Sequence, residues 1–241
     1  KLIMKFLIII PTYNENSNIA SLISIIRNLD VKLKLDILII DDSSPDGTAL
    51  TIKEIMQNDP DLYLIEREKK KGLASAYCCG FKWAIDKNYD YAIQMDADLS
   101  HSPNDIKKFI SNIDHSDIII GSRYKTGVNV VNWPLRRLIL SYFANIYARI
   151  FTGMNIHDLT SGYKCIKVKA LKSIDFKKIK SEGYSFQIEM NFIFANKGFK
   201  LTEVPIIFHD RTVGESKMSK KIILEAIFRV PLFRVKKFLG L

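Results

Sequence analysis

The sequence contains few residues of the kinds that bind zinc or build disulfide scaffolds. Its 241 residues include only four histidines and three cysteines, Cys78, Cys79 and Cys165, and none of them has the spacing of zinc ligands. An odd number of cysteines without a pairing pattern is typical of a reducing compartment. The sequence therefore argues against a zinc enzyme and against a disulfide-stabilised secreted domain.

Further absences narrow the class of protein. The chain has no GxGxxG motif after its first apolar segment and no GxxxxGK motif, so neither a dinucleotide-binding fold nor a P-loop is expected. No apolar stretch reaches the roughly 18 residues that a membrane-spanning helix requires. The apolar run of residues 1–10 is short and leads directly into Pro11, so it predicts a first strand and not a signal peptide.

The residues that are present predict one α/β domain. A hydrophobic content of 47% is ample for a core and excludes general disorder. Short apolar segments alternate with amphipathic ones, so strands are expected at 5–10, 35–40, 62–66, 91–95 and 117–120, and helices at 16–28, 47–57, 74–87 and 104–113. This alternation predicts a mainly parallel sheet with helices on both faces.

The pattern changes after Arg123. A long helix is expected after Pro134, then irregular polar motifs, a helix near 186–195 and a strand at 201–207. No segment of the chain has the composition of an interdomain linker. We therefore expect one catalytic domain at 1–219, followed by a tail at 220–241.

The formal net charge of +10 is unevenly distributed. Residues 133–154 carry three arginines and no acid, and residues 217–241 carry seven basic residues against Glu225 alone. Both segments also have apolar residues at helical spacing. We predict an interfacial amphipathic helix at 133–154 and a membrane-apposed tail at 220–241, both on an anionic membrane surface. The alternative is a pair of core-facing helices with solvated basic faces. Nucleic acid is not expected, because no aromatic-interleaved basic stripe is present.

Two acidic clusters follow apolar segments: Asp41-Asp42 and Asp96-Ala97-Asp98. In α/β sheets, the carboxyl ends of the strands are where ligands bind. Asp96 and Asp98 are two residues apart, so both carboxylates can turn toward one cation if the chain kinks there. Mg²⁺ is usually held by one or two carboxylates together with substrate phosphates, which predicts an enzyme that acts on a nucleotide diphosphate. The alternative is that these residues only cap the following helices.

Three residues near the first two strand ends fit a nucleoside. Tyr13 can stack on a base, and Glu15 can accept hydrogen bonds from a base or a ribose. Asp42 lies at the end of the second predicted strand and could contact the other side of the nucleoside.

Five motifs follow one another in order: Pro11–Glu15, Asp41–Thr48, Met95–His101, Gly121–Tyr124 and Gly214–Lys217. Together they resemble the glycosyltransferases of family two, which have the GT-A nucleotide-sugar-binding fold. Within that family, the chain is most similar to the dolichol- or polyprenol-phosphate mannosyltransferases. Three motifs are more selective for this branch: Asp158–Gly162, Gly183–Met190 and Asp210-Arg211. The resemblance spans residues 5 to about 219.

The resemblance implies an inverting transfer of mannose from GDP-mannose to dolichyl or polyprenyl phosphate at the cytoplasmic face of a membrane, with Mg²⁺ or Mn²⁺. It places Pro11, Tyr13, Glu15, Ile40 and Asp42 around the nucleoside. It assigns the metal and the diphosphate to Asp96, Ala97 and Asp98, with Asp98 as the principal ligand. It also places Arg123, Arg211 and Lys217 on phosphate groups, so that Asp98, Arg123, Arg211 and Lys217 form the catalytic set.

One departure concerns the metal. Some relatives have a glutamine as a further ligand where this chain has Ser100, a poorer ligand. Spacing also leaves open whether Gln187 or Glu189 faces the site.

The implied chemistry agrees with the residue types. A cation neutralises the leaving group as a Lewis acid. An anionic lipid phosphate needs no strong general base, but it needs cations to bring two anions together. Two alternatives stay open: a UDP-sugar donor with the same fold and acceptor, and a membrane-bound nucleotide-sugar sensor without turnover. A partner subunit is compatible with all three.

Overall fold

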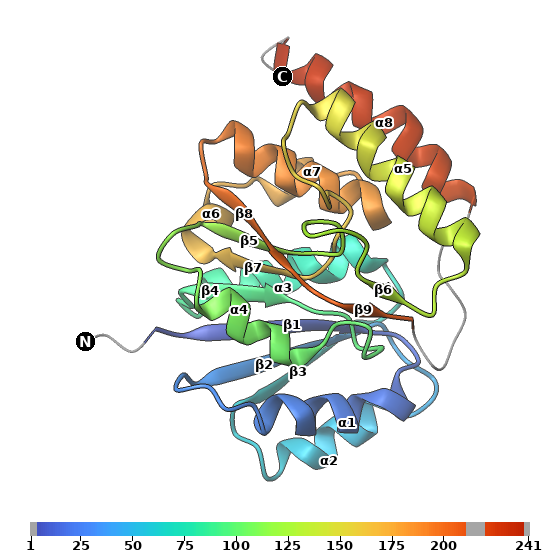
Figure 1. Ribbon diagram of the computed structural model, residues 1–241. Coiled ribbons are helices and arrows are strands. Elements are labelled where there is room, and N and C mark those ends of the chain that lie inside the picture. Colours follow the sequence, from blue (N-terminus) through green and yellow to red (C-terminus); the bar gives the residue numbers. More distant parts are fainter. Residues whose placement is uncertain (1–3, 211–219, 239–241) are drawn as a thin grey trace.

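The predicted alternation of strands and helices is confirmed by a computed structural model of the protein, which describes residues 4–210 and 220–238. One sheet has the strand order β3-β2-β1-β4-β7-β5-β8 (Figure 1). Its strands are β1 (Phe6–Thr12), β2 (Leu35–Asp41), β3 (Leu62–Glu66), β4 (Tyr91–Gln94), β5 (Ile118–Ser122), β7 (Lys164–Lys167) and β8 (Leu201–Pro205). A second, two-stranded sheet joins β6 (Val130–Val131) to β9 (Phe208–His209).

Strand β7 was not predicted, and it is antiparallel to both of its neighbours, β4 and β5. Its four residues are too short for an alternating pattern, and Lys164 is buried at a position where a charged residue argues against a central strand. Because β7 runs against its neighbours, its first residue lies at the edge where β1, β2 and β4 end. Lys164 is therefore paired with Gln94, the last residue of β4.

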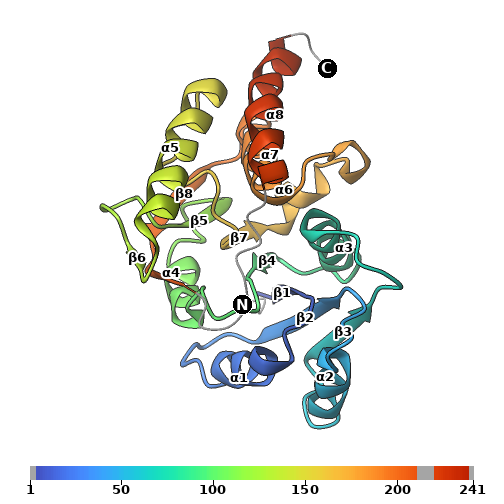
Figure 2. The ribbon, with the colours of Figure 1, turned by 90° about the vertical axis from the view of Figure 1, so that its right-hand side faces the viewer.

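Helices cover both faces of the sheet, as predicted (Figure 2). On one face, Phe6, Ile8 and Ile10 of β1 pack with the apolar side of α1. On the other face, Leu7 and Ile9 pack with α3. The first face carries α1 (Asn16–Arg27), α2 (Thr48–Met56), the 3₁₀ turn η1 (Pro103–Asp105) and α4 (Ile106–Ile110), and the second carries α3 (Leu73–Asp86), α6 (Val168–Lys172), η2 (Phe176–Lys178) and α7 (Gly183–Asn196).

Two long helices, α5 (Leu135–Thr152) and α8 (Lys220–Phe238), project from the same side of the domain (Figures 1 and 2). The Tyr147 hydroxyl of α5 donates a hydrogen bond to the Ile227 carbonyl of α8 at 2.7 Å. Helix α8 also buries Val230 and Phe233 against the core. Among the helices in the described ranges, none combines the length and apolar character that crossing a bilayer requires.

The apolar stripe predicted for 133–154 is on the surface and does not face the core. Large apolar side chains are exposed on α5 (Leu135, Ile139, Leu140, Tyr142, Phe143, Ile150 and Phe151) and on α8 (Leu224, Ile227, Phe228, Leu232 and Val235). The apolar residues of α8 do not all lie on one side of the helix. Val230 and Phe233 are buried, whereas Ile227 and Val235 are exposed. The tail is thus a packed helix with one exposed apolar side.

The close approach of α3 to β1 depends on Gly80. A methyl group at this position would lie 2.5 Å from Cγ2 of Ile9. We expect Gly80→Ala to lower the free energy of unfolding by about 1–3 kcal/mol through overpacking, measured by urea denaturation.

The matched control is Gly162→Ala, where a methyl group would have no neighbour nearer than 3.5 Å. This variant should change the free energy of unfolding by less than about 1 kcal/mol. Equal losses in the two variants would show that the α3–β1 approach does not require a glycine.

Candidate active site

Three neighbouring parallel strands, β1, β2 and β4, end at one edge of the sheet. Shortly after each strand, one residue other than glycine has a positive φ: Asn14 (59°), Ser43 (60°) and Leu99 (60°). Such residues are uncommon, and strained backbone of this kind is concentrated at functional sites. The edge that carries the predicted acidic clusters therefore also carries three residues in an uncommon backbone conformation.

The chain bends at residues 97–99, shortly after the end of β4. Leu99 reverses the chain so that Ser100 returns onto Asp98. The Ser100 hydroxyl donates to Asp98 Oδ1 at 2.5 Å, and the Ser100 N–H donates to the same oxygen at 3.1 Å. Ser100 occupies the position at which a glutamine metal ligand could be expected. Its two hydrogen bonds fix the orientation of the Asp98 carboxylate.

Asp96 is held from several sides. The Tyr77 hydroxyl donates to Asp96 Oδ1 at 3.1 Å, and the Asp96 N–H donates to Nδ1 of His101 at 3.1 Å. Burial raises the pKa of Tyr77 well above its ordinary value, with a further contribution from the Asp96 charge, so this phenol stays a donor. The His101 ring stacks on Tyr163 at 4.7 Å. Asp96 Oδ2 points toward Gly162, where a methyl group would lie 4.0 Å away.

Asp42 organises the basic loop that precedes α3. Its carboxylate forms a buried ion pair with Arg67 and accepts the Lys71 N–H at 3.2 Å. The Arg67 guanidinium also donates a hydrogen bond to the Ser75 hydroxyl at 2.8 Å. Arg67 was not predicted as a site residue, although it is a basic residue that directly follows the strand predicted at 62–66.

The other residues expected around a nucleoside occupy different environments. The half-buried Tyr13 ring carries the Lys70 ammonium 3.6 Å from its centroid, a cation–π contact. Glu15 is buried and accepts a hydrogen bond from the Asn18 amide at 3.0 Å. The Ile40 side chain is 0% exposed and packs in the core. A contact between Ile40 and a nucleoside would therefore have to come through its backbone, and the predicted contact stays a prediction.

Two further predicted residues lie at the acidic edge, and two lie outside the described part of the chain. Pro11, half-buried, and Ala97, buried, lie at the same edge as Asp96. Arg211 and Lys217 fall outside the described residues, so their predicted contacts with phosphate stay predictions.

Arg123 forms an internal ion pair. Its guanidinium donates to both carboxylate oxygens of Asp158, at 2.7 and 2.6 Å, and to the Thr160 hydroxyl at 2.8 Å. Both partners are buried. Burial alone would raise the pKa of Asp158, but the charge and hydrogen bonds of Arg123 lower it overall. The structure thus pairs Arg123 with the Asp158–Gly162 motif, and a direct contact between Arg123 and phosphate remains only a prediction.

The same network reaches α5. The Asn145 side chain accepts the Thr160 N–H at 3.2 Å and donates to the Thr160 hydroxyl at 3.2 Å. At the beginning of α5, Arg137 pairs with Asp210 at 2.6 Å and stacks on Trp133 at 4.1 Å. Arg137 was predicted only as one of the arginines of the basic segment at 133–154.

The choice between Gln187 and Glu189 is decided by geometry. Nε2 of Gln187 would lie 3.5 Å from a methyl group at Gly162, so Gln187 faces the Asp96 side. Glu189 accepts the Ser181 N–H at 3.2 Å instead. The Lys164 ammonium donates to Gln187 Oε1 at 2.7 Å, and burial lowers the pKa of Lys164 to about 7.

An acidic edge at the carboxyl ends of parallel strands is compatible with a nucleotide diphosphate held through a metal ion. Comparison with known proteins shows to which protein family the chain belongs. Residues 7–175 match the family "Glycosyl transferase family 2". The chain therefore belongs to glycosyltransferase family 2, and its fold is of the GT-A type.

Three curated relatives are similar over most of this chain. Polyprenol monophosphomannose synthase of Mycolicibacterium smegmatis is 42% identical, covering 93% of this chain and 84% of that protein. Undecaprenyl-phosphate mannosyltransferase of Micrococcus luteus is 40% identical, covering 94% and 93%. Dolichol-phosphate mannosyltransferase of Pyrococcus furiosus is 38% identical, covering 98% of this chain and 65% of that protein.

Solved structures of more distant proteins share the fold. One is glucosyl-3-phosphoglycerate synthase from Mycobacterium tuberculosis in complex with Mn²⁺ and uridine-diphosphate-glucose. It superposes with a TM-score of 0.66 at 15% identity, covering 96% of this chain and 78% of that one. At this identity the likeness concerns the fold alone.

The Arg123–Asp158 pair generates a prediction about stability. Arg123→Ala would leave a buried carboxylate without its partner, so we expect a loss of about 3–5 kcal/mol in the free energy of unfolding, measured by urea denaturation.

The exposed neighbour Arg136 serves as the control, and Arg136→Ala should stay within about 0.5 kcal/mol of the parent. If Arg123→Ala kept the stability of the parent and lost only affinity for phosphate, the internal pair would not be the main role of Arg123.

Proposed function

We propose that this protein transfers mannose from GDP-mannose to a polyprenyl (dolichyl) phosphate at the cytoplasmic face of a membrane. The observation that carries the proposal is the combination of two surfaces in one domain. The acidic edge at Asp96 and Asp98 suits a nucleotide diphosphate, and the exposed apolar sides of α5 and α8 suit lipid. The three curated relatives, named for transfer of mannose to polyprenyl phosphates, support the same reaction.

The residues at this edge fit a hard divalent cation, Mg²⁺ or Mn²⁺. No cluster of three or more His, Cys, Asp or Glu side chains able to hold a metal occurs within 4–210 and 220–238. Two carboxylates completed by substrate phosphates are, however, the usual Mg²⁺ environment. Asp98, oriented by Ser100, and Asp96 would hold the ion. When bound, it would neutralise charge on the diphosphate leaving group.

The acceptor explains why the site needs cations more than a base. A phosphate monoester carries between one and two negative charges near neutral pH, so it can attack without losing a proton to the enzyme. The chain must instead hold two anions close together. Arg137 would supply positive charge, together with Arg211 and Lys217, whose contacts with phosphate are predicted from the sequence. Arg123 would hold the loop that carries Thr160.

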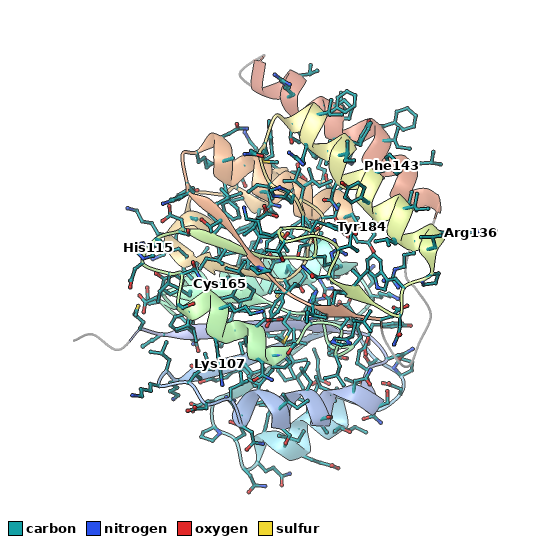
Figure 3. All side chains as sticks on the ribbon, in the orientation of Figure 1. Lys107, His115, Arg136, Phe143, Cys165 and Tyr184 are labelled. Atoms are coloured by element: carbon teal, nitrogen blue, oxygen red, sulfur yellow. The ribbon has the colours of Figure 1, made fainter. Side chains whose placement is uncertain are left out.

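The lipid would reach the site along the two projecting helices. A cavity of about 200 Å³ lies between α5, α7 and α8, and Arg137 and Tyr184 are in its walls together with apolar side chains such as Leu140 and Ile188. Arg136 and Phe143 lie on α5 at the periphery of the molecule (Figure 3). We place the phosphate of the acceptor at the Arg137 end and its hydrocarbon against the apolar walls and the bilayer.

The direct test is a product assay. The protein is incubated with a panel of GDP- and UDP-sugars, a short polyprenyl phosphate and either Mg²⁺ or Mn²⁺, and the glycolipid is identified by mass spectrometry. We expect a mannosyl phospholipid from GDP-mannose. A glycolipid formed only from a UDP-sugar would overturn the donor, and nucleotide-sugar binding without any glycolipid would indicate a sensor.

Asp98 generates a prediction about turnover. Asp98→Asn removes a charged ligand while keeping the shape of the side chain, so kcat should fall by at least about a hundredfold with the circular dichroism spectrum unchanged. Chelation should inactivate the parent reversibly.

Asp117→Asn is the matched control, because Asp117 directly precedes β5 and so lies at the opposite edge of the sheet. It should keep the activity of the parent. Full activity of Asp98→Asn, or of the chelated parent, would contradict a metal-dependent reaction.

The exposed apolar sides of α5 and α8 generate a prediction about membranes. Phe143→Ser and Phe228→Ser should each weaken binding to vesicles of phosphatidylglycerol and phosphatidylcholine, measured by co-sedimentation, because both side chains are exposed at 61% and 70%. Binding of the parent should also weaken as salt rises, since basic residues near an anionic surface are screened.

Leu50→Ser is the control: Leu50 is 65% exposed on α2, at the end of the molecule away from α5 and α8 (Figure 2). It should bind vesicles like the parent. Equal weakening by all three substitutions would show that binding is not directed by the two helices.

A further inference from the structure

A buried polar pair lies next to the acidic edge, and neither the metal nor the phosphates account for it. Lys164, at the beginning of β7, is 0% exposed, and Gln187 of α7 is 2% exposed. The Lys164 ammonium donates to Gln187 Oε1 at 2.7 Å and to the Gln187 carbonyl at 3.2 Å. Burying a lysine is costly, so its retention inside a sheet calls for an explanation.

Lys164 fixes which end of the Gln187 amide points where. When protonated, the Lys164 amine only donates hydrogen bonds, and both of its partners are oxygens of Gln187, so the amide oxygen faces it. Nε2, with its two N–H donors, then faces the opposite direction, toward Gly162 and Asp96. Nε2 is buried and has no acceptor among the described residues. Unpaired buried donors are uncommon in native proteins, so this donor is available to a ligand.

Gly162 leaves open the space that Nε2 faces. A methyl group on Gly162 would be 3.5 Å from Gln187 Nε2, 3.9 Å from His101 Cε1 and 4.0 Å from Asp96 Oδ2. The backbone of Gly162 is not in the left-handed region, so nothing in its conformation requires a glycine. The missing side chain therefore makes room for an atom between a hydrogen-bond donor and a carboxylate acceptor.

We propose that Gln187 Nε2 and Asp96 Oδ2 together bind one hydroxyl group of the sugar of the donor, and that Lys164 is the positioning residue that keeps the Gln187 amide in this orientation. The chemistry at this point favours a hydroxyl over the other parts of a nucleotide sugar. An amide N–H repels a cation, and a carboxylate repels a phosphate oxygen. Only a hydroxyl accepts from one and donates to the other.

This inference rests on the proposed function only in taking a nucleotide sugar as the ligand. It adds a device for choosing the sugar. A sugar without a hydroxyl at this position would leave both Nε2 and Asp96 Oδ2 unpaired in a buried site, which is how enzymes reject such analogues most strongly.

The test compares a nucleotide sugar with the same nucleotide without its sugar. Dissociation constants are measured by calorimetry for GDP-mannose and GDP, and for UDP-glucose and UDP, and the pair that the parent binds is used. Gln187→Met keeps the length of the side chain and removes its N–H donors. We expect the ratio of the Kd of the nucleotide sugar to that of the free nucleotide to rise about tenfold, equivalent to about 1.4 kcal/mol. The Kd of the free nucleotide should change less than twofold.

Three companion variants separate contact from folding. Glu189→Gln alters the same helix where it faces Ser181, so the ratio should not change. Gly162→Ala keeps Gln187 and Lys164 but fills the space, so the ratio should rise. The single variant Lys164→Met should raise the ratio. The double variant Lys164→Met/Gln187→Met should have the same ratio as Gln187→Met, because both side chains act through the Gln187 amide.

Monodeoxy analogues of the sugar identify the hydroxyl. One analogue should bind the parent about tenfold more weakly than the full nucleotide sugar. The same analogue should lose less affinity in Gln187→Met, where Asp96 is the remaining partner of the hydroxyl. If Gln187→Met and Gly162→Ala both keep the ratio of the parent, the hydroxyl site is wrong. If the Kd values of nucleotide and nucleotide sugar rise equally, Gln187 acts on the nucleotide or the fold. Because only nucleotide binding is read, these outcomes are distinct from a failure to form a mannolipid.

Discussion

The buried ion pair of Arg123 and Asp158 is the interaction on which the sheet edge, the loop at 158–162 and helix α5 jointly depend. Charges withdrawn from water are tolerated only when they are paired and hydrogen-bonded. Here the pair is bidentate and Thr160 adds a further acceptor. Because Asn145 of α5 holds Thr160, one charge pair connects the acidic edge to the helix with the exposed apolar side. In the proposed reaction between a water-soluble donor and a lipid acceptor, this pair would hold the two substrate-binding surfaces in a fixed relation.

The same rule governs the acids at the edge of the sheet. Asp42 is paired with Arg67, Asp98 is oriented by Ser100, and Asp96 accepts from Tyr77. None of these carboxylates depends on a ligand to set its direction, so the site is organised in advance, which is how enzymes avoid reorganisation during the reaction. In the proposed mechanism, the orphaned Nε2 of Gln187 is the complement: a donor left open for the sugar.

Most of the fold could be predicted from the sequence because its signals are local. Alternating apolar segments located the nine elements predicted before residue 121 to within a few residues, and acidic residues after strands marked the predicted functional edge. Strand β7 escaped prediction because its four residues carry no periodic pattern and begin with a buried lysine. The core packing of the Ile40 side chain and the partner of Arg123 were not predicted for a related reason. Sequence position next to the edge does not reveal whether a side chain faces the ligand, the core or an internal partner.

The sequence by itself determined the family, the mainly parallel sheet and the place of Asp96 and Asp98, since each follows from neighbouring residues and motif order. Only the tertiary structure decided which charges pair, because Asp158 lies 35 residues from Arg123. It also decided that Gln187, and not Glu189, faces Asp96, and that the apolar side of α5 lies outside the core. These outcomes depend on which distant segments pack together, and the antiparallel course of β7 brings Lys164 to the one edge where it can hold Gln187.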